Sequence, residues 1–350
     1  MKKNVKRAII TGITGQDGSY LAELLLMKGY EVHGIRRRTS FENTQNLHMI
    51  DITPQKKKKK LYLHYADMID TASINYLTKE IKPDEFYNLA AQSHVHYSFQ
   101  APDYTTQVNA ISVIKILEGI AKLSHKTKFY QASTSEIYGN IKPFKSINEK
   151  TPFNPCSPYA NSKLFSHHLV QDFKKRGLFC VSGILFNHES PRRPVNFVTM
   201  KVIDSAIKIK SGLMDCLYIG NMYSYRDWGY APEYVEAMWR MLNISKTPKD
   251  YIISTSKSYM IKYFINFVFN KIGFKLKWMG KGLNEYAIDI VSNKVVIRVD
   301  PYYFRPNEVG YLKGSYLKAK KEINWEPMTN ISQLIEIMIS ARAKYLNLVL

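Results

Sequence analysis

Three glycines, Gly12, Gly15 and Gly18, constrain the fold of this chain more than any other feature of its sequence. They stand directly between an apolar, β-branched run at residues 7–11 and a stretch at 19–28 that carries leucines at helical spacing. In this context glycines let the backbone turn tightly and approach a pyrophosphate, whose charge is met by free amides at the helix N-terminus. The pattern therefore predicts a dinucleotide-binding loop made of Gly12, Ile13, Thr14, Gly15, Gln16, Asp17 and Gly18.

Apolar runs and helical stretches alternate along the first half of the 350 residues, which is typical of βαβ units and a parallel sheet. We predict strands at residues 7–11, 31–35, 61–65, 85–89, 128–133 and 179–186. We predict helices at residues 19–28, 71–79, 105–123, 159–176, 201–211, 232–242, 259–272 and 331–346. The fold class is therefore α/β, a Rossmann-type doubly wound parallel sheet with a smaller, discontinuous C-terminal substrate domain.

The pattern becomes mixed after residue 186, which predicts two domains. The nucleotide-binding domain is predicted to span residues 1–186, with later segments near 218–240 and 290–310 returning to it. The smaller, substrate-binding domain is predicted to comprise residues 187–217, 241–289 and 311–350.

The composition is that of a folded globular protein with a large positive charge. Apolar residues make up 45% of the chain and the net charge is +21. Most of the excess is lysine spread along the chain without a nucleic-acid-binding motif, so we interpret it as a solvated surface and predict no nucleic-acid partner. No apolar run is long enough for a membrane span, and the three cysteines lack the spacing of a disulfide framework or zinc site. We therefore predict a cytoplasmic protein with reduced thiols, no membrane contact and no metal site.

The end of the second predicted strand indicates which dinucleotide the loop prefers. NAD-binding proteins usually place a carboxylate there for the ribose 2′-hydroxyl, whereas this chain has Arg36, Arg37 and Arg38. Because arginine pairs bidentately with phosphate oxygens, the cluster favours the 2′-phosphate of NADP. We therefore predict NADP as the cofactor, with Arg36 and Arg37 among its ligands. Asp67, just after the third predicted strand, is placed to accept a hydrogen bond from the adenine amino group.

Four side chains form the predicted catalytic group. Tyr159 and Lys163 lie four residues apart on one face of a predicted helix, and the lysine cation can bring the tyrosine pKa down from its usual value near 10. Thr134 and Glu136 follow the fifth predicted strand, at the edge where open α/β sheets bind ligands. Thr134 can bond a substrate hydroxyl, and Glu136 supplies a second acid–base group. An alcohol dehydrogenase or simple epimerase needs only the first proton relay, so Glu136 indicates that a carbon-bound proton is also removed.

Longer stretches carry a resemblance to a known family. They are TGITGQDGSYLAE at 11–23, FYQASTSEIYG at 129–139, GILFNHESPRR at 183–193 and YFRPNE at 303–308. With them the chain resembles the extended short-chain dehydrogenase/reductases and, among these, the GDP-mannose 4,6-dehydratase family, over nearly its whole length. The resemblance implies a lyase that acts on GDP-mannose through an internal redox cycle. Hydride passes from C4 of the mannose to tightly bound NADP, water is lost across C5 and C6, and the hydride returns to C6, the first step toward GDP-fucose or related deoxyhexoses.

The resemblance also implies residue roles beyond those derived above. Cofactor contacts are implied for Met68, Leu89, Ala90, Ala91, Gln92, Ser93, Tyr104, Lys163, His188 and Arg193. Substrate contacts are implied for Ser93, Thr134, Ser135, Glu136, Tyr159, Asn187, Phe197, Lys201, Arg226, Arg305 and Glu308. Of these, Asn187, Arg226 and Arg305 would meet the GDP phosphates, and Glu308 the guanosine ribose. A homodimer or homotetramer is implied, with the loop at 37–44 near a neighbour's cofactor.

Some positions depart from the family pattern. Met200 stands where the family usually has an arginine, Gly-Ser-Tyr at 314–316 replaces Gly-Asp-Pro, and the five lysines at 56–60 are a local elaboration. None of these changes touches the four predicted catalytic residues. Two alternatives remain: another NADP-dependent nucleotide-sugar dehydratase or epimerase, and a non-catalytic NADP-binding protein.

Overall fold

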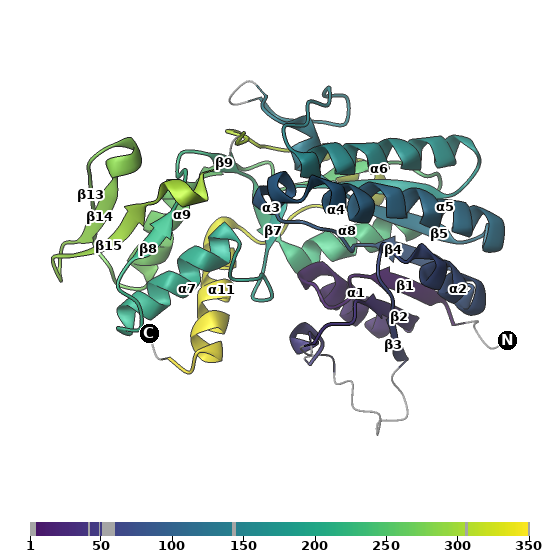
Figure 1. Cartoon of the computed structure of the whole chain (residues 1–350), viewed down its shortest axis with the longest axis horizontal. Coiled ribbons are helices and arrows are strands. Elements are labelled where there is room, and N and C mark those ends of the chain that lie inside the picture. The colour runs from purple at the N-terminus through teal and green to yellow at the C-terminus, as the bar shows by residue number, and fades with distance from the viewer. Residues whose placement is uncertain are drawn as a thin grey trace.

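The computed structural model describes residues 5–40, 43–48, 50, 60–141, 145–304 and 307–348. Two blocks lie side by side in this part of the chain, and short strands join them at the centre (Figure 1). The larger block holds the N-terminal half of the chain, and the smaller one holds most of the C-terminal third.

A seven-stranded parallel sheet forms the centre of the larger block, with the strand order β11-β6-β5-β4-β1-β2-β3. Its strands are β1 (Arg7–Thr11), β2 (Glu31–Arg36), β3 (Leu61–Tyr65), β4 (Glu85–Asn88), β5 (Lys128–Thr134), β6 (Cys180–Leu185) and β11 (Tyr251–Ile253). The chain runs outward from β1 to β3 and then returns to β4 on the other side of β1. The order therefore reverses between β1 and β4, and open α/β sheets bind ligands beyond the carboxyl ends of the strands at such a point.

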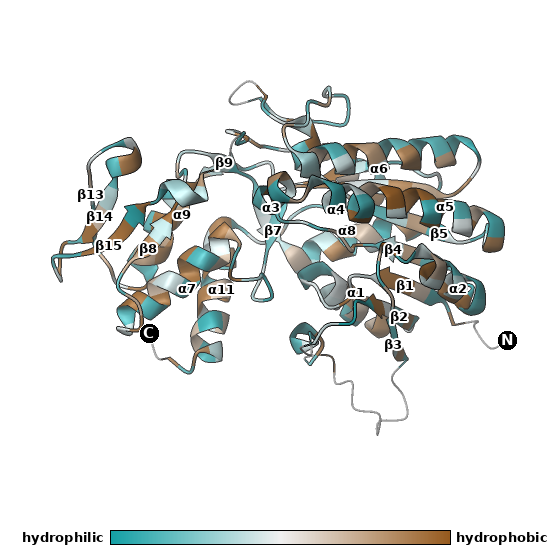
Figure 2. Ribbon diagram, in the orientation of Figure 1, coloured by the Kyte–Doolittle hydropathy of each residue, from teal (hydrophilic) through white to brown (hydrophobic). Residues whose placement is uncertain are grey.

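Helices cover both faces of this sheet, because successive strand residues point to opposite sides. Phe86 and Phe129 pack on one face, and the next residues, Tyr87 and Tyr130, pack on the other. The tyrosine side is covered by α1 (Gln16–Met27), α8 (Ala231–Asn243) and α10 (Leu317–Ile323). The phenylalanine side is covered by α2 (Thr71–Ile81), α5 (Ser112–Leu123) and α6 (Pro158–Lys175). Figure 2 shows the apolar colour on the strands and on the helix sides that face them.

The predicted helix at 105–123 is interrupted. The chain forms α3 (Val95–Gln100), α4 (Pro102–Thr106) and a π-helical turn at Gln107–Ile111 before α5 begins. Within that turn Asn109 is buried, accepts a hydrogen bond from the Gln92 amide at 2.9 Å and donates to the Gln92 carbonyl at 3.0 Å. Such π-turns occur frequently at functional sites. The two bonds of Asn109 fix Gln92, which lies in the segment that follows β4.

The smaller block has a four-stranded sheet of order β13-β14-β15-β8, in which only the β15–β8 pairing is parallel. Its strands are β8 (Leu217–Ile219), β13 (Leu276–Met279), β14 (Tyr286–Asp289) and β15 (Lys294–Val299). An apolar core joins this sheet to α7 (Val198–Lys210), α9 (Ile261–Lys271) and α11 (Ile331–Tyr345). Short 3-10 turns lie at Gln45–Leu47, Ser135–Tyr138, Gly282–Asn284 and Pro301–Tyr303.

Two small strand pairs connect the blocks. β7 (Asn187–Glu189) pairs in parallel with β10 (Trp228–Tyr230), and β9 (Tyr225–Arg226) pairs antiparallel with β12 (Tyr259–Met260). Figure 1 shows β7 and β9 between the two blocks. The residues that they carry therefore lie between the nucleotide-binding sheet and the smaller block.

The structure corrects the predicted domain boundaries in three segments. The range 241–289 was assigned to the substrate domain, but it contains β11, which pairs with β6 in the main sheet. The range 290–310 was assigned to the nucleotide-binding domain, but its strand β15 pairs with β8 in the smaller sheet. The range 311–350 is divided, because Ala319 and Ile323 of α10 pack in the core of the larger block whereas α11 packs in the smaller one. Neither β11 nor β15 was among the predicted strands, because periodicity is ambiguous for such short apolar runs, and periodicity does not say which sheet a strand joins.

Candidate active site

The glycine loop has the backbone that a dinucleotide requires. Gly12 has a φ of 70°, and a Cβ there would lie 2.9 Å from Cα of Ala90. A Cβ on Gly18 would lie 2.3 Å from the carbonyl oxygen of Gly12, so larger residues do not fit at either position. Gly15 begins α1 without a side-chain cap, which leaves the amides of the first turn to bind an anion. The loop thus fits the pyrophosphate of NAD(P).

The segment after β4 lies directly against this loop. Thr11 accepts hydrogen bonds from the amides of Leu89 and Ala90 at 3.0 and 3.1 Å. The structure therefore brings two predicted cofactor segments, 12–18 and 89–93, together at the point where the strand order reverses. Asp67, which follows β3, accepts from the Ile69 amide at 3.2 Å, and Met68 is buried beside it.

Neutral hydroxyl groups hold the arginines at the end of β2. Arg36 lies over the ring of Tyr65, with 4.6 Å from its guanidinium carbon to the ring centroid, and donates to the Tyr65 hydroxyl at 2.6 Å. Arg37 is exposed and donates to the hydroxyl of Tyr104 at 3.0 Å. Because tyrosine hydroxyls leave the guanidinium charge uncompensated, these arginines fit a 2′-phosphate.

The predicted catalytic residues lie together beyond the carboxyl end of β5. Thr134 ends that strand, and the 3-10 turn that follows it places Glu136 beside it. Ser157 caps α6 by accepting from the Ala160 amide at 3.1 Å, which sets the first turn that carries Tyr159. The Thr134 side chain lies near the Tyr159 hydroxyl and favours its ionised form. Lys163, one turn later on α6, donates from Nζ to the Ala132 carbonyl at 3.0 Å.

Burial dominates the electrostatics of this group. It raises the pKa of Tyr159 to about 12, with Glu136 adding to the rise and Thr134 and Arg193 opposing it. Burial also lowers the pKa of Lys163 to about 8. Without cofactor, Tyr159 is therefore a protonated acid at neutral pH, and it becomes a base only when further positive charge stabilises its phenolate.

The predicted substrate residues line the junction between the two blocks. Asn187 is on β7, and its Oδ1 is buried without a hydrogen-bond partner among the described residues. Arg226 on β9 is buried, and its Nη2 lies 3.4 Å from Oε1 of Glu308. The structure therefore brings Arg226 and Glu308 together. Arg305 lies outside the described residues.

The side chains of two further predicted site residues make cation–π contacts near the start of α7. Arg193 lies over the ring of Phe197, with 3.7 Å to the centroid, and its Nε is 3.1 Å from Oε2 of Glu189. Lys201 lies 3.2 Å from the centroid of Tyr303, and burial lowers its pKa to about 8. Met200, at the position where the family pattern has an arginine, is buried in the core of the smaller block. This explains why an apolar residue is stable there.

Sequence reasoning missed two buried polar residues at the site. Asn109 also donates to the Ser162 hydroxyl at 3.2 Å, so it supports the helix that carries Tyr159. Asp227 follows Arg226 and accepts from the amide and hydroxyl of Thr255 at 2.8 and 2.6 Å, and burial raises its pKa to about 6. Asn109 could have been found as a polar residue on the apolar side of a predicted helix. Asp227 could not, because its environment is set by Thr255, 28 residues later in the chain.

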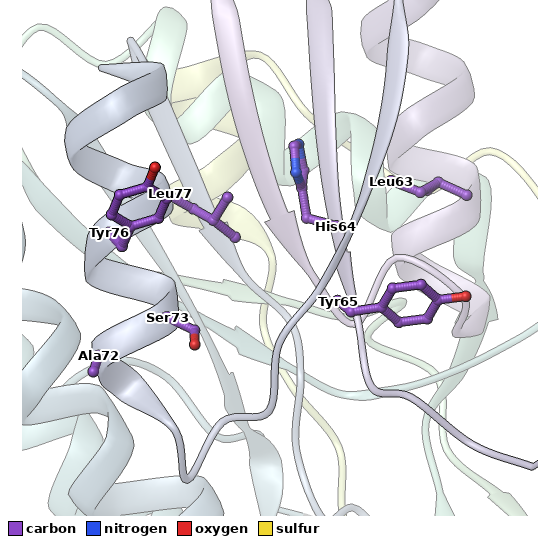
Figure 3. A pocket seen from close by; sticks show the side chains of 7 residues that line it. All are labelled: Leu63, His64, Tyr65, Ala72, Ser73, Tyr76 and Leu77. Carbon is purple, nitrogen blue, oxygen red and sulfur yellow. The ribbon is translucent and has the colours of Figure 1, made fainter.

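A surface groove lies away from these residues, between β3 and α2 (Figure 3). It is lined by Leu63, His64, Tyr65, Ala72, Ser73, Tyr76 and Leu77. None of these is a predicted site residue, and only Tyr65 contacts one, Arg36. We therefore do not assign the catalytic site to this groove.

The part of the chain that is described contains neither a candidate metal cluster nor a candidate membrane-spanning helix. No group of three or more His, Cys, Asp or Glu side chains there could hold a metal ion. No helix among the same residues is long and apolar enough to cross a membrane. Cys156, Cys180 and Cys216 are free thiols.

Comparison with known proteins identifies the family. A family profile described as GDP-mannose 4,6 dehydratase matches residues 9–338. The chain is 44% identical to the GDP-mannose 4,6-dehydratase of Yersinia enterocolitica over 349 residues, which cover 96% of this chain and 93% of that protein. It is 45% identical to the GDP-mannose 4,6 dehydratase of Homo sapiens over 338 residues, covering 95% and 90% of the two chains. The chain belongs to the GDP-mannose 4,6-dehydratase family.

Solved structures show how widely the fold of this family member is shared. The dTDP-glucose 4,6-dehydratase of Bacillus anthracis in complex with NAD superimposes with a TM-score of 0.79 at 19% identity, covering 97% of each chain. RMD from Pseudomonas aeruginosa, complexed with NADPH, superimposes with a TM-score of 0.74 at 20% identity, covering 97% of this chain and 100% of that one. At these identities the likeness shows the fold alone, an NAD(P)-binding short-chain dehydrogenase/reductase fold. The predicted fold class, family and hydro-lyase class are confirmed.

Proposed function

We propose that this protein converts GDP-mannose to GDP-4-keto-6-deoxymannose, with NADP as a tightly bound and internally recycled cofactor. The observation that supports this best is the meeting of Thr134, Glu136, Tyr159 and Lys163 beyond the carboxyl end of β5. One hydroxyl-directed base and one separate carboxylate suit a reaction that oxidises an alcohol and also eliminates water.

Each residue has a distinct task in this reaction. Bound NADP supplies a hydride acceptor for C4 of the mannose and later a donor for C6. Tyr159 removes the proton of the C4 hydroxyl. Arg193 opposes the rise in the tyrosine pKa, and Lys163, one turn later on α6, would supply the further positive charge that the phenolate needs. The C4 ketone makes the C5 proton acidic, so Glu136 removes that proton and then protonates the departing C6 hydroxyl. Thr134 orients the sugar through its hydroxyl.

The binding roles follow the same layout. We assign the pyrophosphate of the cofactor to residues 12–18, the adenine to Asp67 and Met68, the nicotinamide half to Arg193, and further cofactor contacts to 89–93 and Tyr104. We assign the GDP phosphates to donors on two residues, the side-chain NH2 of Asn187 on β7 and the guanidinium of Arg226 on β9. The homodimer or homotetramer, and the cytoplasmic location, remain predictions from the sequence.

The central test is to incubate the purified protein with GDP-mannose and other nucleotide sugars and follow product mass and cofactor absorbance. We expect GDP-mannose to lose one water while no NADPH accumulates, because the hydride returns to C6. A steady build-up of NADPH would contradict the internal cycle. Dehydration of a different nucleotide sugar in preference would favour the related dehydratase or epimerase alternative, and binding without turnover would favour the non-catalytic one.

Cofactor choice gives a second prediction. Arg37 is exposed, and among the described residues its side chain bonds only the Tyr104 hydroxyl. We therefore expect Arg37→Ala to weaken NADP binding by about 1.5–3 kcal/mol, the value of a charged hydrogen bond. NAD lacks the 2′-phosphate, so its affinity should stay nearly unchanged and serves as the internal control. Calorimetric titration with both dinucleotides at one moderate salt concentration measures this. Equal affinity of the wild-type protein for NAD and NADP would show that the arginines do not select the cofactor.

A further inference from the structure

Asp17 places a negative charge where the cofactor's own negative charge is expected. It is the acidic residue in the first turn of α1, two residues after the N-cap residue Gly15. A carboxylate at a helix N-terminus is attracted by the same positive potential that binds a pyrophosphate. Unless it is neutralised, Asp17 therefore competes with and repels the dinucleotide.

His188 neutralises this carboxylate from a distant part of the chain. Its Nε2 lies 2.8 Å from Oδ2 of Asp17, although 171 residues separate the two. Its Nδ1 lies 2.8 Å from the carbonyl oxygen of Phe186. A carbonyl and a carboxylate only accept hydrogen bonds, so both ring nitrogens must carry hydrogen and the ring is an imidazolium cation.

The surroundings of this pair agree with an ionised state. Both side chains are largely buried, at 12% exposure for His188 and 21% for Asp17. Burial alone would lower the pKa of His188, but Asp17 and the Phe186 carbonyl outweigh it and raise the pKa. The Asp17 pKa is lowered, because His188 and Gln16 outweigh the effect of burial. The other charge that acts on both groups, Arg193, is paired with Glu189.

The position of the imidazolium is fixed by its neighbours. The ring stacks on Tyr234 with 4.6 Å between centroids. Gln16 donates to the His188 carbonyl at 3.1 Å and accepts from the Ser190 hydroxyl at 2.8 Å. With both nitrogens bonded to protein groups, the ring does not offer a donor to the cofactor. Its role is therefore different from the direct cofactor contact that the family resemblance implies for this side chain.

We propose that His188 is a charge-compensating positioning residue of the cofactor site. Its imidazolium neutralises Asp17 and holds the carboxylate against β7, so that the first-turn amides of α1 remain available to the pyrophosphate. This inference rests on the proposed assignment of the glycine loop to the cofactor, but it does not depend on the dehydration reaction.

The test compares NADP and NAD binding by titration calorimetry in His188→Asn, Asp17→Asn and the double variant. His188→Asn leaves the carboxylate unpaired, so we expect both dinucleotides to bind about ten- to a hundredfold more weakly. Asp17→Asn removes the repulsion as well as the pair, so we expect it to bind both dinucleotides more tightly than His188→Asn does. The double variant should recover to the same level, which a purely structural contact would not do.

Arg192→Gln is the matched control, because it breaks another ion pair between the same two segments. Arg192 bonds Glu23 at 2.5 Å in the second turn of α1 and the Ser19 hydroxyl at 3.1 Å, and neither bond involves Asp17. We expect this variant to bind both dinucleotides like the wild type. Equal weakening in all three test variants would show a structural tether and overturn the charge role, as would wild-type affinity in His188→Asn.

A direct measurement covers the case in which His188→Asn does not fold. In wild-type protein with isotope-labelled histidine rings, we expect the buried His188 ring to retain two protonated nitrogens at a pH at which exposed histidines have become neutral, and a His188 ring that loses its proton together with them would overturn the proposal. The binding readout also separates the two proposals. Normal dinucleotide binding without dehydration would reject the proposed reaction and leave this inference intact, whereas a wild-type protein that binds neither dinucleotide would reject both.

Discussion

Tyr159→Phe is expected to abolish oxidation at C4 and leave the bound cofactor oxidised after substrate is added. The hydroxyl that this change removes is the predicted base for the C4 proton, and general acid–base groups contribute about 10²- to 10⁴-fold to a rate. Tyr159 is buried, and phenylalanine fills the space of its ring, so the fold should remain. The measurement is a single turnover with GDP-mannose, followed by the near-ultraviolet absorbance of reduced nicotinamide and by product mass.

Tyr138→Phe provides a matched control for this experiment. Tyr138 is also buried beyond the end of β5, but its hydroxyl has no hydrogen-bond partner among the described residues. Removing that hydroxyl should leave both the stability and the turnover close to those of the wild type. If Tyr159→Phe dehydrates GDP-mannose as fast as Tyr138→Phe does, Tyr159 is not the base.

Glu136→Gln is expected to stop the reaction one step later. The change keeps the shape of the side chain but removes its ability to take the C5 proton, so oxidation at C4 should still occur while elimination falls by about 10²- to 10⁴-fold. Reduced cofactor should therefore accumulate on the enzyme in a single turnover, which is the opposite of the result expected for Tyr159→Phe. Glu136 is only partly buried in the 3-10 turn after β5, so the substitution should fold normally.

The two variants are informative as a pair. A Tyr159→Phe protein with oxidised cofactor and a Glu136→Gln protein with reduced cofactor together assign the hydroxyl proton to one residue and the carbon-bound proton to the other. Near wild-type dehydration by Glu136→Gln, with Tyr159→Phe inactive, would mean that the role of Glu136 is wrong. The epimerase-like alternative would then be favoured.

Local patterns in the sequence determined much of the larger block. The alternation of apolar runs and helical stretches predicted β1 and β3 at their observed bounds, and the glycine spacing after β1 predicted the turn that the structure shows. The spacing of Tyr159 and Lys163 likewise predicted one helical face. These features depend on residues close together in the chain, where periodicity and steric limits act directly.

Contacts between distant segments were decided only by the tertiary structure. Nothing in the sequence around β11 or β15 says which sheet each strand joins, because a short apolar run can pair with any edge of matching register. Arg226 meets Glu308 across 82 residues, and Asp17 meets His188 across 171. Such pairs form because the folded backbone brings opposite charges into a poorly hydrated junction, where pairing offsets the cost of burying each charge. The sequence alone thus determined the dinucleotide loop, the main strands and the candidate catalytic residues, while the tertiary structure decided domain membership and the charge partners of the site.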